Sequence, residues 1–510
     1  MSVMPNILFV QTDQLTVDVL SAYGQPVAVT PAIDRLAAGG TVFENFYCNF
    51  PLCAPSRASM STGMLASRIG AFDNAAELPA SIPTYAHYLR QAGYYTSLCG
   101  KMHFVGPDQL HGFETRRTTD IYPGDFTWSP DWSKTGFDGA TDSRVLTDSG
   151  VVGRSVQLDY DEETTHQAVQ EIYDSARRED GRPFFLQVSY THPHDPYLCR
   201  QRHWDLYENI DIPAPRTGML SGDDADAHSR RILAQHGFDN ADVSDDDIAK
   251  ARRAYCGSVS FIDAQLEQLL AALEESGQKD NTVVIFTSDH GEMLGERGLW
   301  LKKTFFEPSL RVPMIISAPG HMASRRVTTP ASLVDLLPTF MALATEAGWD
   351  GAVEDLDGQD LCRLTAQPDD PDRPVYAELL SEGILAPIFM IRRGRYKLVT
   401  SKGDPDMLFD LERDPDEHHN LAGHPKHADL LASLRAEAHA KWDSDALSDA
   451  IRLSQRRRHL IRDAHIKGTP PQWDFVPAPM DDSRWYRGHG NYNDWAMDYL
   501  PSQNTPSKQD

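Results

Sequence analysis

Short apolar runs alternate with helix-like stretches along the chain. The segments NILFVQ (6–11), FFLQVSY (184–190) and TVVIFTS (282–288) are nearly continuous runs rich in Val, Ile and Phe, the pattern of strands that are covered on both faces. Between them, SIPTYAHYLRQAG and YCGSVSFIDAQLEQLLAALEESG have a helical pattern, and the second shows apolar residues at helical spacing before a glycine stop. This alternation predicts an α/β sandwich with a mostly parallel sheet between helices.

Ionisable residues stand directly after each predicted strand. These residues are Asp13 and Gln14 after the first run, His192 and His194 after the second, Asp289 and His290 after the third, and Lys101 and His103 after a fourth run, YYTSLCG. In open α/β sheets ligands bind outside the carboxyl ends of the strands, so we expect these side chains to meet at one edge. The convergence is a stronger signal than any single pair, because HxH alone is weak and the Lys101–His103 spacing shows only that both face one side of an extended segment.

Two of these strand ends predict a metal site. A lone aspartate at a strand end usually caps a turn. Asp13 and Asp289, one followed by Gln and the other by His, instead resemble the oxygen ligands and single imidazole of a site for a hard divalent cation. We therefore interpret this pair of strand ends as metal-binding.

Composition and charge narrow the functional classes. A chain of 510 residues, 41% of them hydrophobic and 24% charged, can bury a large core in more than one layer. The formal charge of −26 argues against nucleic acid as a partner, and an anionic small substrate would need a local basic pocket. No apolar run reaches membrane-spanning length, no signal-like segment opens the sequence, and the six cysteines are few and widely spread. We expect a cytoplasmic protein without a membrane partner, most of whose cysteines are reduced and structural.

One cysteine has neighbours that need an explanation. The stretch PLCAPSRASMSTG (51–63) contains Cys53, followed by Pro55 and Arg57. A free cysteine is usually a small buried hydrophobe, and the next alternative is a thiolate nucleophile paired with a histidine. Neither accounts for the proline and the arginine at those offsets. The pattern C-x-P-x-R resembles the sulfatase signature, in which an activating enzyme oxidises the cysteine to formylglycine.

The resemblance to the formylglycine-dependent sulfatases of the alkaline phosphatase superfamily extends over nearly the whole chain, and its choline sulfatase branch is the most similar. The matching segments are DNAAE (73–77), IPTYAHYLRQAGYY, GKMHFVGPDQLHGFE, THPHDPY, SDHGEMLGERGLW and LFDLERDPDEHHNLAG. The resemblance implies an alkaline-phosphatase-like sandwich with a smaller C-terminal antiparallel-sheet subdomain that begins near Tyr376. The expected division is a catalytic α/β domain over 1–375, an α+β subdomain over 376–450 and a tail over 451–510.

The resemblance also implies the ligands of one divalent cation. Asp13, Gln14, Asp289 and His290 match the metal-binding positions of this branch, whereas many other sulfatases have Asp and Asn in place of this Gln and His. An imidazole ligand softens the site, and the related phosphonate monoester hydrolases, with the same four residue types, resemble Mn²⁺ enzymes. The expected ion is therefore Ca²⁺ or Mn²⁺, with Mg²⁺ as a third candidate.

The remaining site residues take their expected roles from the same resemblance. Cys53 becomes an aldehyde, whose hydrate attacks sulfur while the metal polarises the attacking hydroxyl and the sulfuryl oxygens. The other matches are Arg57, Lys101 and His103, which hold the hydrate; His103 as the base that allows sulfate to leave; His194 and Lys302, either of which could protonate the leaving group; and Asn74, a sulfate-contacting amide.

The leaving group is less defined by the sequence. Trp128 and Glu378 match positions that enclose choline, which is held by cation–π contacts and a carboxylate. The stretch TGFDGATDSRVL, however, is shorter than its aromatic-rich counterpart in the choline enzymes, so we expect choline sulfate to be accepted weakly and aryl sulfates at least as well. The predicted reaction is hydrolysis of an aryl, alkyl or choline sulfate. One alternative is phosphonate monoester or phosphodiester hydrolysis at the same site. The other is a metal-stabilised binding protein, in which Cys53 would have no function.

Two kinds of protein partner are expected. Conversion of Cys53 requires a formylglycine-generating or equivalent maturation enzyme. The chain after Asp449, with SQRRRHL followed by Trp473, Trp485, Tyr486 and Trp495, is too aromatic for a disordered tail. Related enzymes pack such a tail against a neighbouring subunit, so the resemblance implies a homotetramer or at least a dimer.

Overall fold

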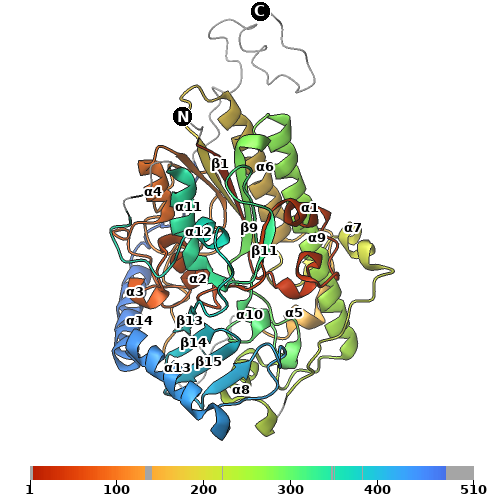
Figure 1. Cartoon of the computed structure of the whole chain (residues 1–510), viewed down its shortest axis with the longest axis vertical. Helices are drawn as coiled ribbons and strands as arrows, with labels where there is room; N and C mark the ends of the chain where they lie inside the picture. The colour runs from red at the N-terminus through yellow and green to blue at the C-terminus, as the bar shows by residue number, and fades with distance from the viewer. Residues whose placement is uncertain are drawn as a thin grey trace, which may run out of the picture.

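An eight-stranded sheet runs through the centre of the molecule (Figure 1). The computed structural model describes residues 4–132, 141–220, 222–345, 349, 351–381 and 383–477. The strand order is β11-β2-β10-β9-β1-β7-β4-β5. The strands are β1 (Asn6–Thr12), β2 (Thr41–Phe43), β4 (Tyr95–Gly100), β5 (Thr115–Arg116), β7 (Phe184–Ser189), β9 (Thr282–Ser288), β10 (Met314–Ser317) and β11 (Arg325–Val327). All four apolar runs named above are strands of this sheet.

The four central strands are parallel to one another. β1 pairs in parallel with both β7 and β9, and β4 pairs in parallel with β7. On the other side of β9, β10 is antiparallel. The carboxyl ends of β9, β1, β7 and β4 therefore lie next to one another at one edge of the sheet, where the predicted site residues follow.

Helices cover both faces of the sheet, as the apolar runs predict. Along β1, Ile7 and Phe9 belong to one hydrophobic core, while Leu8 and Val10 belong to the other, because successive strand residues point to opposite faces. The first core is completed by α2 (Cys53–Thr62), α4 (Tyr85–Gln91) and α11 (Leu336–Ala344), and the second by α1 (Pro31–Gly39), α6 (Val156–Arg177) and α9 (Asp245–Glu275). Figure 1 shows these two groups of helices on either side of the sheet.

A smaller antiparallel sheet packs at one end of the molecule (Figure 1). It consists of β13 (Val375–Leu379), β14 (Ile388–Arg393), β15 (Tyr396–Ser401) and β16 (Met407–Asp410), and it is followed by α13 (Ala428–Lys441) and α14 (Ser444–Ile466). The large and small sheets confirm the predicted fold class. The division of the chain into three domains stays a prediction; β13 begins at Val375, and α14 runs across the expected boundary at residue 450.

Short elements connect these parts. They are α3 (Ala66–Ile69), α5 (Arg144–Thr147), α7 (Gln201–Trp204), α8 (Ala227–His236), α10 (Glu307–Leu310), α12 (Leu361–Thr365) and two two-stranded ladders, β3 (Phe46–Tyr47) with β12 (Ala331–Ser332) and β6 (Gly150–Val151) with β8 (Leu198–Cys199). All six cysteines are free thiols. None of the helices in the described ranges combines the length and the apolar character that a membrane span requires.

Candidate active site

The strand-end residues meet at the carboxyl edge of the sheet. One potential ligand atom from each of Asp13, Cys53, Asp289 and His290 lies within 4.8 Å of the others, and all four residues are buried. Three of the four sequence-predicted metal residues, Asp13, Asp289 and His290, are therefore neighbours of the candidate nucleophile in space, although Asp13 and His290 lie far apart in the sequence.

The backbone at this edge adopts conformations that few residues tolerate. β4 ends at Gly100 with φ of 101°, and a Cβ there would lie 1.9 Å from the carbonyl oxygen of Ser189, so only glycine lets the chain turn into Lys101. Gln14 and His103 have φ of 66° and 56°, which is unusual for residues that have a side chain. Such backbone strain persists where surrounding contacts over-determine it, and it is common at functional sites.

Cys53 is the first residue of the buried helix α2. Its Sγ lies 3.3 Å from His290 Nε2 and 3.8 Å from Asp13 Oδ1, and the residue is only 1% exposed. Burial would raise the pKa of the Cys53 thiol, but the ammonium groups of Lys101 and Lys302 outweigh it and hold the pKa well below its ordinary value. An anion at this position is also favoured by the N-terminal end of the helix.

The spacing of the C-x-P-x-R motif follows from the geometry of α2. Pro55 lies in the first turn, where backbone N–H groups have no partner within the helix and proline is tolerated. Arg57, four residues after Cys53, lies on the same helix face. Its guanidinium donates to Asp289 Oδ2 at 2.8 Å and to Asp13 Oδ2 at 3.1 Å. Arg57 thus bridges the two carboxylates from a fully buried position.

Each of the two central carboxylates turns one oxygen toward His290, and Asp289 Oδ1 also accepts from the N–H groups of Gln14 and His290, at 3.2 and 2.9 Å. Asp13 Oδ2 accepts from Lys101 Nζ as well as from Arg57. The Oδ1 atoms of Asp13 and Asp289 lie 3.6 and 3.7 Å from His290 Nε2. Burial and Cys53 would raise the pKa of Asp13, but Lys101, His194 and Arg57 outweigh them and hold it below its ordinary value. One carboxylate oxygen of each aspartate and one imidazole nitrogen therefore face each other, a donor set that fits a divalent cation.

His103 is enclosed by aromatic rings. Its imidazole packs 5.1 Å from the ring of Tyr122 and 5.7 Å from that of Trp128, measured between centroids. Both of its ring nitrogens are buried without a hydrogen-bond partner among the described residues. Lys101 Nζ also lies 4.2 Å from the centre of the Tyr122 ring. Sequence reasoning missed Tyr122, because it lies in a loop rather than at a strand end.

His194, Lys302 and Gln14 form a polar chain beside this group. His194 Nδ1 lies 2.7 Å from the carbonyl oxygen of Asp195, and its Nε2 lies 2.8 Å from Lys302 Nζ. Lys302 Nζ in turn donates to Gln14 Oε1. Burial lowers the pKa of His194, but Asp195, Asp13 and Cys53 together outweigh this effect and raise it. The pair of His194 and Lys302 can therefore hold a proton at the cavity surface.

These residues open onto a cavity of about 1150 Å³. Cys53, Asn74, Trp128, His194 and Lys302 all line it. Asn74 Oδ1 accepts from the Ala54 N–H at 3.0 Å, so its NH₂ group is the part left to donate to an anion. The cavity accounts for the predicted nucleophile and proton donors and for two of the three predicted substrate contacts.

The last described helix forms one wall of the cavity. Its lining residues on α14 are Arg456, His459, Arg462 and Asp463. Arg458, on the same helix, makes a two-pronged ion pair with Asp73 at 2.7 Å for both bonds and donates to Ser129 Oγ at 3.1 Å. Asp73 and Ser129 are the sequence neighbours of Asn74 and Trp128. Sequence reasoning assigned this region to a tail and missed these contacts of Arg458 with Asp73 and Ser129, which we call the Arg458 clamp.

Glu378, the third predicted substrate contact, does not line the cavity. The residue is fully buried in β13; Oε1 accepts from the Ser67 N–H at 2.6 Å and Oε2 accepts from Trp442 Nε1 at 2.9 Å. Burial raises its pKa to about 7. Because both oxygens are committed, one to α3 and the other to Trp442 after α13, the structure does not bring Glu378 together with Trp128.

Parts of two other predictions fall outside the described residues. In the shortened stretch TGFDGATDSRVL, residues 135–140 are not described, whereas Thr141, Asp142, Arg144 and Val145 line the cavity. Trp485, Tyr486 and Trp495 also lie outside the described residues. Trp473 is described, and its ring packs 5.2 Å from that of Phe126.

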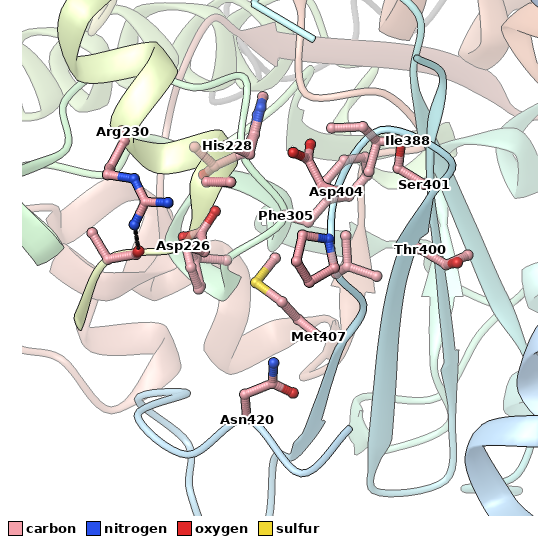
Figure 2. Close-up of a pocket in the computed structure, with 16 residues that line it drawn as sticks. Asp226, His228, Arg230, Phe305, Ile388, Thr400, Ser401, Asp404, Met407 and Asn420 are labelled. Atoms are coloured by element: carbon pink, nitrogen blue, oxygen red, sulfur yellow. Dashed lines mark hydrogen bonds between the residues drawn. The ribbon is translucent and has the colours of Figure 1, made fainter. Parts of the chain in front are cut away.

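A second, smaller cavity lies behind the Lys302 segment. It measures about 250 Å³, and its lining residues come from α8, from the segment 304–306 and from the small sheet (Figure 2). His228 Nε2 lies 2.7 Å from the carbonyl oxygen of Lys303, which ties α8 to the chain next to Lys302. None of the site residues predicted from the sequence lines this cavity.

Comparison with known proteins identifies the family. Residues 5–346 match the sulfatase family, and residues 295–443 match the C-terminal family of N-sulphoglucosamine sulphohydrolase. The chain belongs to the sulfatase family, and it is a sulfuric ester hydrolase. It is 41% identical over 506 residues to choline-sulfatase of Rhizobium meliloti, with 96% of both chains covered. It is 29% identical over 456 residues to an arylsulfatase of Clostridium perfringens, with 84% of this chain and 93% of the relative covered.

Solved structures agree with this assignment at the level of the fold. A phosphonate monoester hydrolase from Silicibacter pomeroyi matches with a TM-score of 0.69 and 25% identity, covering 86% of this chain and 95% of its own. The phosphonate monoester hydrolase of Agrobacterium radiobacter matches with a TM-score of 0.68 and 23% identity over the same shares. The predicted alkaline-phosphatase-like sandwich and membership of the sulfatases close to the choline sulfatase branch are confirmed.

Proposed function

We propose that this sulfatase hydrolyses a small organic sulfate monoester and that Cys53, once oxidised to formylglycine, supplies the nucleophile. The position of Cys53 carries the proposal. Its Sγ lies at the N-terminal end of α2, 3.3 Å from His290 Nε2 and on the side of the two carboxylates where their Oδ1 atoms face His290. The hydrated aldehyde supplies a hydroxyl that can attack sulfur in line with the leaving group.

Asp13, Gln14, Asp289 and His290 would hold one divalent cation at this position. When bound, the cation polarises the attacking hydroxyl and offsets charge on the sulfuryl oxygens. The donor set supports Ca²⁺ or Mn²⁺, with Mg²⁺ as a third candidate, because oxygen ligands are combined with an imidazole. Metal analysis of the purified protein, with reconstitution of the metal-free form by each ion, tests this assignment.

The remaining site residues have two proposed roles, stabilisation of charge and transfer of protons. Arg57 and Lys101 fix the carboxylates and place positive charge beside Cys53. His103, whose ring nitrogens are unpartnered among the described residues, is the proposed base for the second hydroxyl of the hydrate. His194 or Lys302 delivers a proton to the leaving oxygen, and the Asn74 NH₂ contacts the sulfate. Each of these roles is a proposal that variants at the named position can test.

Substitution of Cys53 tests the nucleophile. In Cys53→Ala and Cys53→Ser, neither side chain can form the hydrated aldehyde, so we expect kcat to fall roughly a thousandfold or more with the fold intact. Mass analysis of the peptide that contains residue 53 should show the aldehyde or its hydrate in the wild type. Full activity of a protein that carries only unmodified Cys53 would refute this mechanism.

Choline sulfate is the first substrate that we propose. The choline-sulfatase relative at 41% identity supports it, and Trp128 and Tyr122 bring two aromatic faces to the cavity. The shortened stretch and the position of Glu378 argue for aryl sulfates instead, as does the arylsulfatase relative. Parallel kcat/KM measurements with choline sulfate and nitrophenyl sulfate decide between them. Because the choline-sulfatase relative covers 96% of this chain, the expected result reverses the expectation drawn from the shortened stretch: a preference for choline sulfate that Trp128→Ala abolishes.

Phosphonate monoester hydrolysis is the second candidate. Two structural neighbours are phosphonate monoester hydrolases, and electrostatic stabilisation of the kind found here also suits a phosphoryl centre. A phosphonate monoester in the same assay tests it; the second candidate is retained only if its kcat/KM approaches that of the best sulfate ester.

The cellular setting completes the proposal. A formylglycine-generating or equivalent enzyme would mature Cys53. We also propose a cytoplasmic location, which the unpaired state of the other five cysteines supports, and a homotetramer or dimer, which the resemblance to related enzymes supports. Cell fractionation and light scattering of the purified protein test these two statements.

A further inference from the structure

The Gln14 amide could adopt either of two orientations related by a flip, and only one of them suits the proposed metal site. A primary amide has an acceptor oxygen and a donor NH₂ group of nearly the same shape, and only the oxygen can bind a cation. Gln14 is fully buried at the end of β1, so water does not decide which of the two faces the metal residues. A protein group has to fix the amide.

Two carboxylates occupy the NH₂ side of the amide. Gln14 Nε2 donates to Glu292 Oε2 at 2.5 Å and to Asp195 Oδ1 at 3.3 Å. On the other side, Gln14 Oε1 accepts from Lys302 Nζ, and Lys302 lines the same cavity as Cys53. When Glu292 is ionised, its oxygens only accept hydrogen bonds, so a flipped amide would set oxygen against oxygen. The contacts therefore permit one orientation, with Oε1 toward the cavity.

The Glu292 carboxylate is itself fixed by hydrogen bonds, so it cannot reorient if the Gln14 amide flips. Its Oε1 accepts from the N–H groups of Leu294 and Leu301, at 2.8 and 2.7 Å, and the residue is fully buried. With Oε1 committed to two backbone donors, Oε2 has a fixed position opposite Gln14. Leu301 immediately precedes Lys302, so the same carboxylate also anchors the segment that carries the ammonium group.

We propose that Glu292 is a positioning residue that orients the Gln14 amide toward the metal. The inference rests on the proposed metal site. Glu292 stands one layer behind the Gln14 amide and fixes it through the hydrogen bond to Nε2. Substitution of a residue that holds a metal ligand by a hydrogen bond typically lowers the metal affinity by about 10–100-fold.

A nearly isosteric variant isolates the orientation. In Glu292→Gln, the new oxygen still faces the N–H groups of Leu294 and Leu301, so the new NH₂ must face Gln14. Two NH₂ groups then oppose each other, whereas Asp195 and Lys302 still favour the original orientation, so the Gln14 amide loses its single fixed orientation and presents its oxygen to the metal less often. The matched control is Glu296→Gln, which alters a carboxylate four residues away that also accepts two backbone N–H groups but does not contact Gln14.

The measurement is metal affinity rather than turnover. Metal-free protein is titrated with Mn²⁺, and free Mn²⁺ is followed by its paramagnetic resonance signal. We expect Glu292→Gln to raise the dissociation constant tenfold or more and Glu296→Gln to stay within about twofold of the wild type. Gln14→Met, which has no oxygen ligand, should also weaken binding, and adding Glu292→Gln to it should cost little more.

The wild type, the two single variants and the double variant separate the ways in which the inference can fail. Wild-type affinity in Glu292→Gln, or in Gln14→Met, overturns the positioning role while the metal site stands. An equal loss from Glu292→Gln with and without Gln14→Met overturns it too, because Glu292 would then act through its charge and not through the amide. If the wild type itself binds no Mn²⁺ and no Ca²⁺ competes, the proposed metal site is what fails.

Discussion

At the residue scale, buried charges determine what the site can do. Moving an isolated carboxylate out of water costs several kcal/mol, and a close opposite charge repays this only with good geometry. Asp13 and Asp289 meet that condition, because Arg57 donates to one oxygen of each. The remaining oxygens carry charge that Arg57 does not cover. Because Lys101 adds a second positive charge beside Asp13, the affinity of the site for a cation depends on the placement of these oxygens opposite His290 and not on an excess of negative charge.

Proton delivery by His194 should show in both leaving-group and pH dependence. In His194→Ala, we expect kcat/KM for an alkyl sulfate to fall by about 10²–10⁴, and that for nitrophenyl sulfate much less, because nitrophenolate leaves without a proton. Wild-type activity on the alkyl ester should decline as the pH rises through the raised pKa of His194, since the acid form is lost there. Asp195→Asn should move this decline to lower pH. A decline that stays in place would contradict the role of the Asp195 carboxylate.

Glu378 should affect stability and not substrate choice. In Glu378→Gln, one of two buried donors, Ser67 N–H or Trp442 Nε1, loses its acceptor, at a cost of about 1–3 kcal/mol. The folded-state pKa of about 7 lies above that of an unfolded glutamate. The native state therefore holds more protons than the unfolded state between about pH 4.5 and 7, so Glu378 contributes less stability as the pH rises through this window.

Thermal unfolding of both proteins from pH 5 to 8 checks this prediction. The wild type should be the more stable protein at pH 5, and the difference should narrow toward pH 8. The ratio of kcat/KM for choline sulfate to that for nitrophenyl sulfate should not change. A selective loss of choline sulfate turnover in Glu378→Gln would instead support the sequence-based prediction that Glu378 helps to enclose choline.

At the element scale, α14 joins the substrate side of the cavity to the rest of the fold. Arg458 holds Asp73 and Ser129, Gln455 Oε1 accepts from the Trp132 N–H at 3.0 Å, and His459 Nε2 lies 3.0 Å from the carbonyl oxygen of Pro130. One helix face thus fixes the loop that carries Trp128.

Breaking the Arg458 clamp should therefore weaken substrate binding more than chemistry. Arg458→Met leaves Asp73 buried without its partner, which we expect to destabilise the fold by about 3–5 kcal/mol and to raise KM. Mn²⁺ affinity should match that of the wild type, because the metal residues lie on other elements. Arg457→Met is the control, since Arg457 is the exposed neighbour on the same helix. Equal KM values for the two variants would remove α14 from the substrate site.

The strands show how far the sequence can predict the site. Asp13, Lys101, His194 and Asp289 could be predicted because parallel strands place their ends at one edge, whatever the details of packing. The pairs Gln14–Glu292 and Asp73–Arg458 could not, because their members lie 278 and 385 residues apart and share no local pattern. Glu378 illustrates the same limit. It was predicted to contact the substrate, but its burial gives it a structural contact instead, and burial cannot be read from a single sequence.

At the scale of the whole molecule, the metal should couple activity to stability. A cation that binds only the folded protein stabilises it by about 2.7 kcal/mol at a concentration 100 times its dissociation constant. Chelation should therefore abolish turnover and also lower Tm, and adding back the native ion should restore both. The comparison of EGTA with EDTA, followed by Ca²⁺, Mn²⁺ or Mg²⁺, identifies the ion. Unchanged Tm and activity after complete removal of metal would contradict the proposed site.

The wall that α14 adds to the cavity has an evolutionary consequence. The residues proposed to act on sulfur come from the sheet edge and its loops, whereas another wall of the cavity comes partly from α14 and the loop that it holds. The two sets can then change independently. Exchange of α14 together with residues 126–132 between relatives would be a route to a new leaving-group preference on an unaltered reaction centre, and diversification of this lineage can proceed through that exchange.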